Sequence, residues 1–136
     1  SRQMKHSSLL VFGDLDRLKI INDNYGHDEG DWAIKTTAEI IRSVFRSTDI
    51  TARLGGDEFT IFAANMKEEL VPVFLKKINE LLDEKKKANG KKYVLSISLG
   101  HVICPPEGKL GIEEYMQAAD KNLYEQKAER HRKNQL

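Results

Sequence analysis

Two adjacent carboxylates, Asp57 and Glu58, stand at the mouth of a predicted strand. They follow Gly55 and Gly56, and strand-like apolar runs flank these four residues on both sides. Two glycines between two such runs predict a tight hairpin, because glycine reaches positive φ without a Cβ clash. A hairpin would hold the two acids rigidly, beside backbone that a ligand can approach closely. This arrangement suits metal or phosphate chemistry, and a solvated acidic turn is the alternative interpretation.

A third acid, Asp14, follows the continuous apolar run 9–12. Such a run predicts a central strand covered on both faces, and open sheets bind ligands just past the ends of such strands. If this strand neighbours the hairpin, three carboxylates converge. Two like charges about 4 Å apart repel by about 4 kcal/mol at an effective dielectric of about 20, so the cluster needs a shared proton or a cation. Three separate surface acids are the alternative, and spacing alone favours neither.

Oxygen ligands without a neighbouring His or Cys select a hard cation such as Mg²⁺, with Mn²⁺ as a second candidate. Mg²⁺ with few protein ligands completes its shell with water and substrate phosphates. The acids therefore indicate nucleoside triphosphate chemistry, in which the metal stabilises an in-line displacement.

Length and composition fit one globular domain, residues 1–136, with 40% hydrophobic and 32% charged residues. The formal net charge of +1 provides no overall field for a nucleic acid polymer or an anionic membrane. The only cysteine, Cys104, excludes an internal disulfide framework and fits a reducing compartment. No apolar run approaches the roughly 20 residues of a membrane span. We therefore expect a cytoplasmic domain without membrane contact of its own, whose parent protein can still be membrane-anchored.

Hydrophobic periodicity predicts the elements that position the acids. Strands are expected at 9–12, 50–54, 59–64 and 93–103, and helices at 17–24, 28–46, 67–87 and 112–130. The order β-α-α-β-β-α-β-α predicts an α/β (α+β) fold, a mixed, mostly antiparallel sheet with helices packed on it.

Finer features of two helices also follow from the pattern. Asp28 is expected to cap the second helix, with Asp31 as its capping-box partner. The inward positions of that helix are predicted at Ile34, Ala38, Ile41 and Phe45, and those of the last helix at Ile112, Met116, Ala119 and Leu123.

Residues 55–59, Gly-Gly-Asp-Glu-Phe, resemble the signature of the GGDEF family, the diguanylate cyclases. In register with it, residues 14–31 resemble the family's Asp-x-Asp-x-Phe-Lys-x-x-Asn-Asp…Gly-His-x-x-Gly-Asp segment, with Leu18 in place of Phe. The resemblance continues through 98–100 and 119–127 and so covers nearly the whole chain. It implies a single catalytic domain with a fold like that of nucleotidyl cyclases and polymerase palms.

The chain departs from the family at both ends. The family opens with a helical segment carrying Asp-x-Leu-Thr-Gly-Leu, which nothing here matches, so the domain is expected to lack that start. The family follows its last-helix lysine with x-x-Gly-Arg-Asn. Here Lys127 is followed by Ala-Glu-Arg-His-Arg, which puts Arg130 at the glycine position and His131 at the arginine position.

The resemblance implies a role for each matching residue. Asp14 and Asp57 would bind Mg²⁺ with the backbone carbonyl of Leu15, and Glu58 would be a further ligand or help deprotonate the attacking 3′-hydroxyl. Helix capping is the alternative role for Asp31, and a helix C-terminal position is the alternative for Asn22. By resemblance these two read the guanine edge, because a carboxylate accepts from both N1–H and the exocyclic amine, a donor pair that adenine lacks. The other residues implied at the nucleotide are Leu18, Lys19, Gly55, Gly56 and Lys127.

Arg46 and Asp49 form an Arg-x-x-Asp pattern, and five residues separate its end from Gly55. On its own this pattern usually marks a helix-end salt bridge. The family carries its product-inhibition site at this position, so the resemblance implies that the pair binds cyclic di-GMP, with the planar arginine fork on phosphate and guanine.

Together these features imply a diguanylate cyclase. Each domain would bind one GTP with Mg²⁺, and two domains would meet face to face as a homodimer, brought together by regulatory regions outside this chain. The product would be cyclic di-GMP with two pyrophosphates. The alternative from another class is a non-catalytic module that binds GTP or cyclic di-GMP and signals through a partner. A related cyclase acting within one nucleotide is a third interpretation, and Asp31 disfavours adenine substrates.

Overall fold

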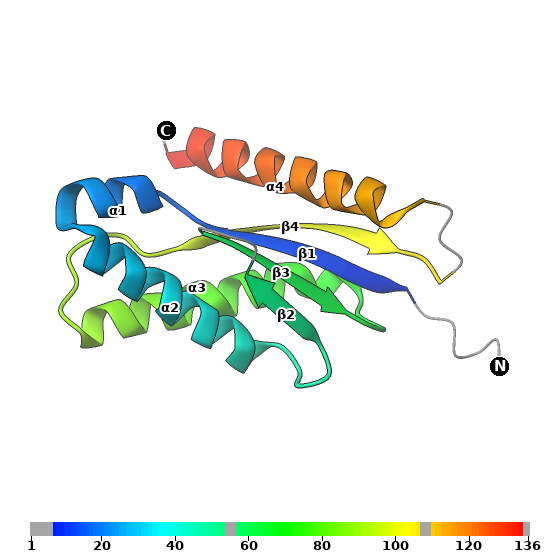
Figure 1. Ribbon diagram of the computed structural model, residues 1–136, viewed down its shortest axis with the longest axis horizontal. Helices are drawn as coiled ribbons and strands as arrows, with labels where there is room; N and C mark the ends of the chain where they lie inside the picture. Colours follow the sequence, from blue (N-terminus) through cyan, green and yellow to red (C-terminus); the bar gives the residue numbers. More distant parts are fainter. Residues whose placement is uncertain (1–6, 54–56, 107–109, 135–136) are drawn as a thin grey trace.

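The computed structural model describes residues 7–53, 57–106 and 110–134 (Figure 1). The elements follow the predicted order, with a short 3₁₀ helix added before the third helix. They are β1 (Ser8–Leu15), α1 (Leu18–Tyr25), α2 (His27–Val44), β2 (Ile50–Arg53), β3 (Glu58–Ala63), η2 (Glu68–Leu70), α3 (Val71–Ala88), β4 (Ile97–Cys104) and α4 (Ile112–Asn134).

The four strands form one sheet in the order β2-β3-β1-β4, and every pairing among them is antiparallel. Strand β1 is central, between β3 and β4, as its continuous apolar run predicted. Helix α4 covers one face of the sheet, and α2 and α3 cover the other (Figure 1). The expected sheet with flanking helices is therefore confirmed.

Alternate residues of β1 enter two separate cores. Leu9, Val11 and Leu15 pack in the larger core with α2 and α3, and Leu10 and Phe12 pack against α4. The α4 side of this smaller core is made by Tyr115, Ala119 and Leu123. Because both faces of β1 are buried, the strand has little freedom to slip in register, and this fixes the place of the residues that follow it.

Gly100 allows α4 to approach β4 closely. A Cβ at this position would lie 2.2 Å from the backbone nitrogen of Leu123, far inside van der Waals contact. The backbone of α4 therefore lies directly on the sheet, and the later residues of the helix reach the end of β1.

The second helix differs from its prediction in start and in inward face. It begins at His27 after Gly26, which has φ 97°, and no side chain caps it among the described residues. Asp28 is therefore a first-turn residue, where its charge suits the positive end of the helix. Of the four predicted inward residues, Ile41 and Phe45 are buried, whereas Ile34 and Ala38 are only half-buried. The other buried positions of the helix are Gly30, Ala33, Thr36, Thr37 and Ile40. A threonine can be inward because the Thr37 hydroxyl donates to the Ala33 carbonyl at 2.7 Å.

Two other predictions fail for geometric reasons. The strand expected from residue 93 begins only at Ile97, because β1 ends at Leu15, the partner of Ile97, and leaves the preceding residues without a strand to pair with. Ile112 was predicted inward but is 61% exposed, since it is the first residue of α4, and Tyr115 is buried instead.

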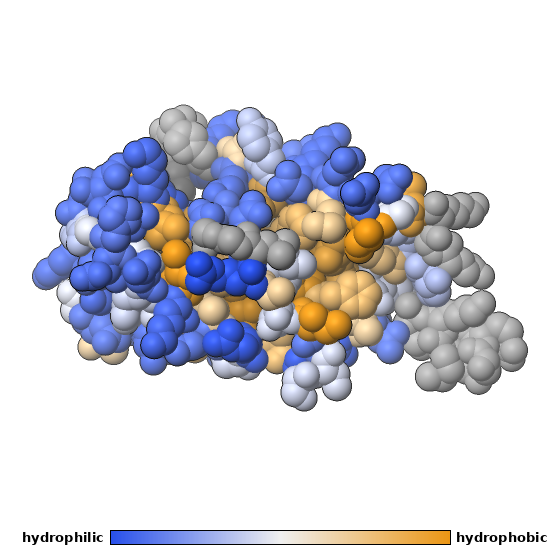
Figure 2. Space-filling view, viewed as in Figure 1, coloured by the Kyte–Doolittle hydropathy of each residue, from blue (hydrophilic) through white to orange (hydrophobic). Residues whose placement is uncertain are grey.

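The surface is unevenly polar on the face shown in Figure 2. Hydrophilic side chains cover the end where α1 and the start of α2 lie, and hydrophobic side chains show between the two helical layers, along the sheet. Within the described part of the chain, no helix is both long enough and apolar enough to cross a membrane.

Candidate active site

The predicted acids lie at the end of β1. The register of β1 and β3 pairs Asp14 with Glu58, and the Leu15 N–H donates to the carbonyl of Asp57 at 3.4 Å. Asp57 immediately precedes β3, so Asp57 and Glu58 lie beside the last residues of the central strand. Gly55 and Gly56 lie outside the described residues.

Among the acids of the site, Asp14 has the carboxyl whose pKa is shifted from its ordinary value. Its Oδ1 is buried and has no hydrogen-bond partner among the described residues, and its Oδ2 accepts from Lys127 Nζ at 2.8 Å. Burial is the main cause that raises the pKa of Asp14 to about 6, and the neighbouring carboxyl of Asp57 adds to it while Lys127 opposes it. A buried oxygen without a partner, beside a second carboxylate, fits a hard cation such as Mg²⁺.

Two carboxylates meet here, whereas the sequence left open that three converge or that none do. No group of three or more acidic, histidine or cysteine side chains is placed to hold a metal ion within residues 7–53, 57–106 and 110–134. The carboxyl of Asp57 neighbours that of Asp14, whereas Glu58 is the partner of Asp14 in the backbone register of β3 and β1. Glu58 is exposed. A metal at this site would need backbone, water or substrate oxygens to complete its shell.

Lys127 reaches the site from α4. It pairs with Asp14, 113 residues away in sequence, and its side chain is 35% exposed. The sequence placed this lysine at the triphosphate but did not predict its contact with the carboxylate.

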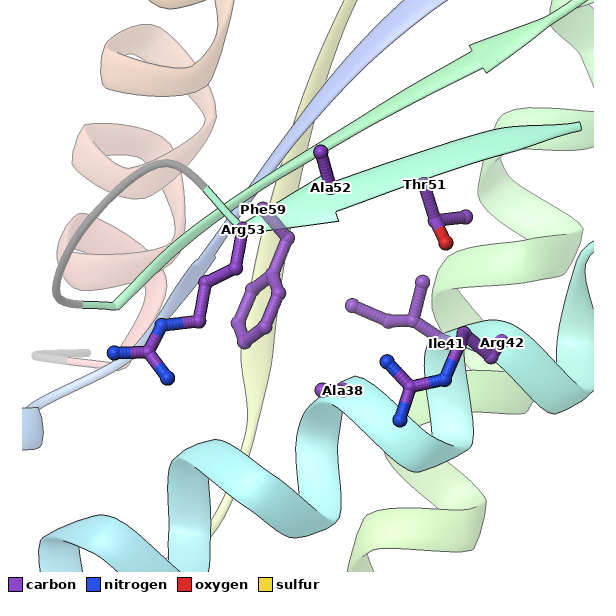
Figure 3. Close-up of a pocket in the computed structure, with 7 residues that line it drawn as sticks. All are labelled: Ala38, Ile41, Arg42, Thr51, Ala52, Arg53 and Phe59. Carbon is purple, nitrogen blue, oxygen red and sulfur yellow. The ribbon is translucent and has the colours of Figure 1, made fainter.

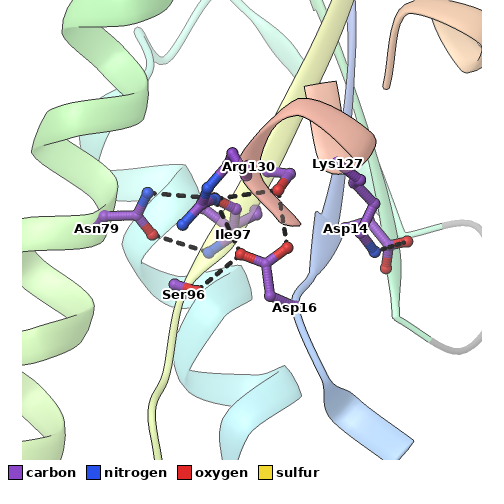
Figure 4. Close-up of polar contacts among 8 residues, drawn as sticks. Asp14, Asp16, Asn79, Ser96, Ile97, Lys127 and Arg130 are labelled. Atoms are coloured by element: carbon purple, nitrogen blue, oxygen red, sulfur yellow. Dashed lines mark hydrogen bonds and ion pairs between the residues drawn. The ribbon is translucent and has the colours of Figure 1, made fainter. Parts of the chain in front are cut away.

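Arg130, one turn later on α4, contacts the second acid of the Asp14-Leu15-Asp16 run (Figure 4). Its Nη1 lies 2.9 Å from Asp16 Oδ2 and also donates to the Ile97 carbonyl at 2.7 Å and to Ser98 Oγ at 3.0 Å. The hydroxyls of Ser96 and Ser98 each donate to Asp16 at 2.7 Å. The arginine at the family's glycine position was the one feature of the sequence that pointed to this cluster.

The predicted guanine-reading residues lie between α1 and α2. A Cβ on Gly30 would lie 1.8 Å from Asn22 Oδ1, so the Asn22 amide rests directly on the first turns of α2. Asp31 follows Gly30 and is exposed. Because no side chain caps α2 among the described residues, the capping role considered for Asp31 is not observed.

A polar cluster that the sequence did not predict ties the start of α2 to the loop before β4. Glu29 accepts from Lys91 Nζ at 3.0 Å and from the Tyr93 hydroxyl at 2.7 Å. These two contacts, Lys91 first, lower the pKa of Glu29. The Lys91 ammonium also lies 4.7 Å from the centre of the Trp32 ring, and the rings of Tyr25 and Tyr93 are 5.1 Å apart. No local pattern could reveal contacts over about sixty residues of sequence.

Two further residues that were predicted to contact the nucleotide, Leu18 and Lys19, lie on α1. Lys19 is 87% exposed and pairs with Asp23 on the surface of α1 at 2.8 Å. Leu18, the first residue of α1, is half-buried against the larger core.

The Arg-x-x-Asp pair closes the connection between α2 and β2. The Arg46 guanidinium contacts both oxygens of Asp49, with the shortest distance 2.7 Å, and donates to the Ala64 carbonyl at 2.6 Å. The Asp49 side chain is only 1% exposed, whereas that of Arg46 is 47% exposed. The structure therefore contains the helix-end salt bridge, and a ligand that used these groups would have to replace part of it.

A small pocket lies between α2 and the edge strand β2, beside the hairpin (Figure 3). Its volume is about 140 Å³, below the roughly 300 Å³ at which pockets for drug-sized ligands begin. Arg42 and Arg53 extend from the two elements on either side of Ala38. The pocket is too small to be the nucleotide site by itself.

The sequence matches known proteins over nearly its whole length. Residues 1–133 match the family model described as "Diguanylate cyclase, GGDEF domain". The chain is 34% identical to cyclic di-GMP phosphodiesterase NbdA of Pseudomonas aeruginosa over 119 residues, 88% of this chain and 15% of that protein. It is also 34% identical to diguanylate cyclase A of Treponema denticola over 128 residues, 93% of this chain and 34% of that protein. Most of each relative thus lies outside the matched region.

A solved structure extends the likeness to the fold. The active GGEEF domain of a diguanylate cyclase from Vibrio cholerae is similar with a TM-score of 0.78 at 25% identity. The similarity covers 91% of this chain and 78% of that one. The fold of this chain is therefore that of known cyclase domains.

Proposed function

Since the chain belongs to the GGDEF family of diguanylate cyclase domains, we propose that it condenses two molecules of GTP into cyclic di-GMP and releases two pyrophosphates. The observation that carries this proposal is the carboxylate of Asp14. It has a buried oxygen without a partner among the described residues, and the carboxyl of Asp57 lies beside it. Such a pair is unfavourable alone and becomes favourable around a cation.

We assign the metal to Asp14, Asp57 and the carbonyl of Leu15, with Mg²⁺ as the expected ion and Mn²⁺ as a substitute. When bound, the ion would stabilise the negative charge that develops on the phosphates during an in-line displacement. Glu58, exposed at the start of β3, would be a further ligand or would accept the proton of the attacking 3′-hydroxyl.

The nucleotide would lie across α1 and α2, with its phosphates toward the end of β1. Asn22 and Asp31 would bind the guanine edge, and the close contact of Asn22 with Gly30 supports this role because it fixes the amide beside Asp31. Lys127 would leave Asp14 to neutralise triphosphate oxygens. The supporting residues at the nucleotide would be Leu18, Lys19, Gly55 and Gly56.

Catalysis would require two copies of the domain. One site holds one GTP, so the 3′-hydroxyl of each nucleotide must reach the α-phosphate held by the other copy, and proximity then sets the rate. Regions of the parent protein outside this chain would control the encounter. Arg46 and Asp49 would form an inhibitory site for the cyclic di-GMP product.

A non-catalytic binding module is the second candidate, and the cations of α4 favour it. Lys127 is paired with Asp14 and Arg130 with Asp16, so both are engaged within the protein rather than directed to a triphosphate. Such a module would bind GTP or cyclic di-GMP and act through a partner.

Incubation with GTP and Mg²⁺ over a wide range of protein concentration separates the two candidates. A cyclase is expected to form cyclic di-GMP faster than linearly with protein concentration, because two domains must meet. Glu58→Gln should slow the reaction, and Glu125→Gln, which removes an exposed carboxylate on α4, should not. Tight GTP binding without pyrophosphate release at any concentration would refute the cyclase and support the binding module.

A further inference from the structure

Helix α4 holds the end of β1 through two ion pairs, and each binds one acid of the Asp14-Leu15-Asp16 run (Figure 4). Lys127 pairs with Asp14 at 2.8 Å, and Arg130 pairs with Asp16 at 2.9 Å. Residues three apart lie on the same side of a helix, so both cations project from one face of α4.

The two contacts differ in how firmly they are held. Arg130 binds three partners, namely Asp16 directly after β1 and the Ile97 carbonyl and Ser98 Oγ on β4. Ile97 is itself bonded to α3, since its N–H donates to Asn79 Oδ1 at 2.8 Å and its carbonyl accepts from Asn79 Nδ2 at 3.1 Å. Arg130 therefore joins α4 to β1, β4 and, through β4, to α3.

Lys127 has a single partner in this cluster, Asp14 Oδ2. A lysine ammonium on a flexible stem with one partner is held less firmly than Nη1 of Arg130, which contacts three. The place of Lys127 thus depends on the position of the helix that carries it, and Arg130 sets that position one turn away.

We propose that Arg130 is a positioning residue that keeps Lys127 on Asp14 when no nucleotide is bound, so that Lys127 serves as an internal counter-ion of the proposed metal site. This inference rests on the metal site of the proposed function. The ammonium is on Oδ2 of Asp14 and leaves Oδ1 without a partner, so it competes with a divalent cation through its charge, by neutralising the carboxylate and repelling the ion. The site then binds metal weakly alone and more tightly once a triphosphate draws Lys127 away.

A double-mutant cycle on Mn²⁺ binding without nucleotide tests this inference, with binding measured by electron paramagnetic resonance. Lys127→Met is expected to tighten Mn²⁺ binding by about fivefold, the scale of a half-exposed ion pair. Arg130→Gln should tighten it by about threefold, because Lys127 is then held less firmly. If Arg130 acts through Lys127, the double variant should bind no more tightly than Lys127→Met alone.

Two further variants keep the test decisive. Arg132→Gln is the matched control, because Arg132 lies on the same helix but pairs with Glu129 on its surface, and it should leave Mn²⁺ affinity unchanged. Arg130→Lys retains the charge but loses the fork, and it replaces Arg130→Gln in the cycle if thermal unfolding shows that the glutamine variant is not folded.

The outcomes separate this inference from the proposed activity. The inference would be overturned if the fold changes in Mn²⁺ affinity caused by Lys127→Met and Arg130→Gln multiply in the double variant. It would also be overturned if neither variant changes the Mn²⁺ affinity. Failure of every variant to bind Mn²⁺ would also overturn it, since Lys127→Met frees Asp14. The cycle contains no GTP, so a non-additive result supports the inference even in a protein that makes no cyclic di-GMP.

Discussion

Replacing Asp14 by asparagine is expected to stabilise the protein at neutral pH while removing its proposed activity. Burial and the neighbouring Asp57 raise the pKa of Asp14 from its ordinary 3.8 to about 6 in the folded state. The folded protein therefore binds a proton more tightly than the unfolded chain, so the stability contribution of Asp14 is lost as pH rises from about 4 through 6.

The size of the effect follows from the pKa difference. Each pH unit corresponds to about 1.4 kcal/mol, so ionised Asp14 costs the folded state about 3 kcal/mol above pH 6. Well below pH 3.8 the carboxyl is neutral in both states and the cost disappears. The attraction of Lys127 is already included in the raised pKa. Asparagine keeps the shape without the charge, so Asp14→Asn removes this cost at neutral pH.

Urea unfolding of wild type and Asp14→Asn at pH 4 and pH 7.5 measures this difference. The stability advantage of the variant should be larger by about 2 kcal/mol at pH 7.5 than at pH 4. Asp120→Asn, which removes an exposed carboxylate of α4, is the matched control for the substitution itself. An advantage that differs by less than about 0.5 kcal/mol between the two pH values would refute the reasoning, because that is the scatter of independent effects.

Other perturbations give separate tests. Gly100→Ala places a Cβ against the backbone of Leu123 and should destabilise the protein by about 1–3 kcal/mol in thermal unfolding; an unchanged midpoint would contradict the close approach of α4. Arg46→Ala should abolish product inhibition while leaving basal turnover, and should also lower the free energy of unfolding by about 1–3 kcal/mol because Asp49 loses its partner. Glu29→Gln loosens the start of α2 from Lys91, so the KM for GTP should rise with kcat unchanged in steady-state kinetics; a fall in kcat alone would contradict this role.

Much of the fold follows from local sequence. The run 9–12 predicts a buried central strand because it is apolar at every position, and the structure buries it between two helical layers. The apolar runs on both sides of the signature predict paired strands, and β2 and β3 pair antiparallel as expected. Asp14 and Asp57 come together because β1 and β3 are neighbours, which the sequence analysis could state only as a condition.

The wrong predictions concern which residues of α2 and α4 face the core, and this depends on tertiary packing rather than on the local sequence pattern. The inward face of α2 depends on how the helix is rotated against its neighbours, so Thr37 is buried and Ala38 is only half-buried. Ile112 is apolar but lies at the start of α4, where it is exposed.

The contacts that the sequence missed join distant parts of the chain. Arg130 meets Asp16 across more than a hundred residues, and Glu29 meets Lys91 across about sixty. Both depend on where a helix docks on the sheet, which is decided by tertiary packing and not by the pattern within either segment.

A crystal structure of the domain with Mn²⁺ and a non-hydrolysable GTP analogue would test the central claim most directly. We predict an anomalous peak between Asp14 and Asp57, with the triphosphate beside it and the guanine edge on Asn22 and Asp31. A nucleotide bound elsewhere, or carboxylates of Asp14 and Asp57 without the ion between them, would contradict the proposed site.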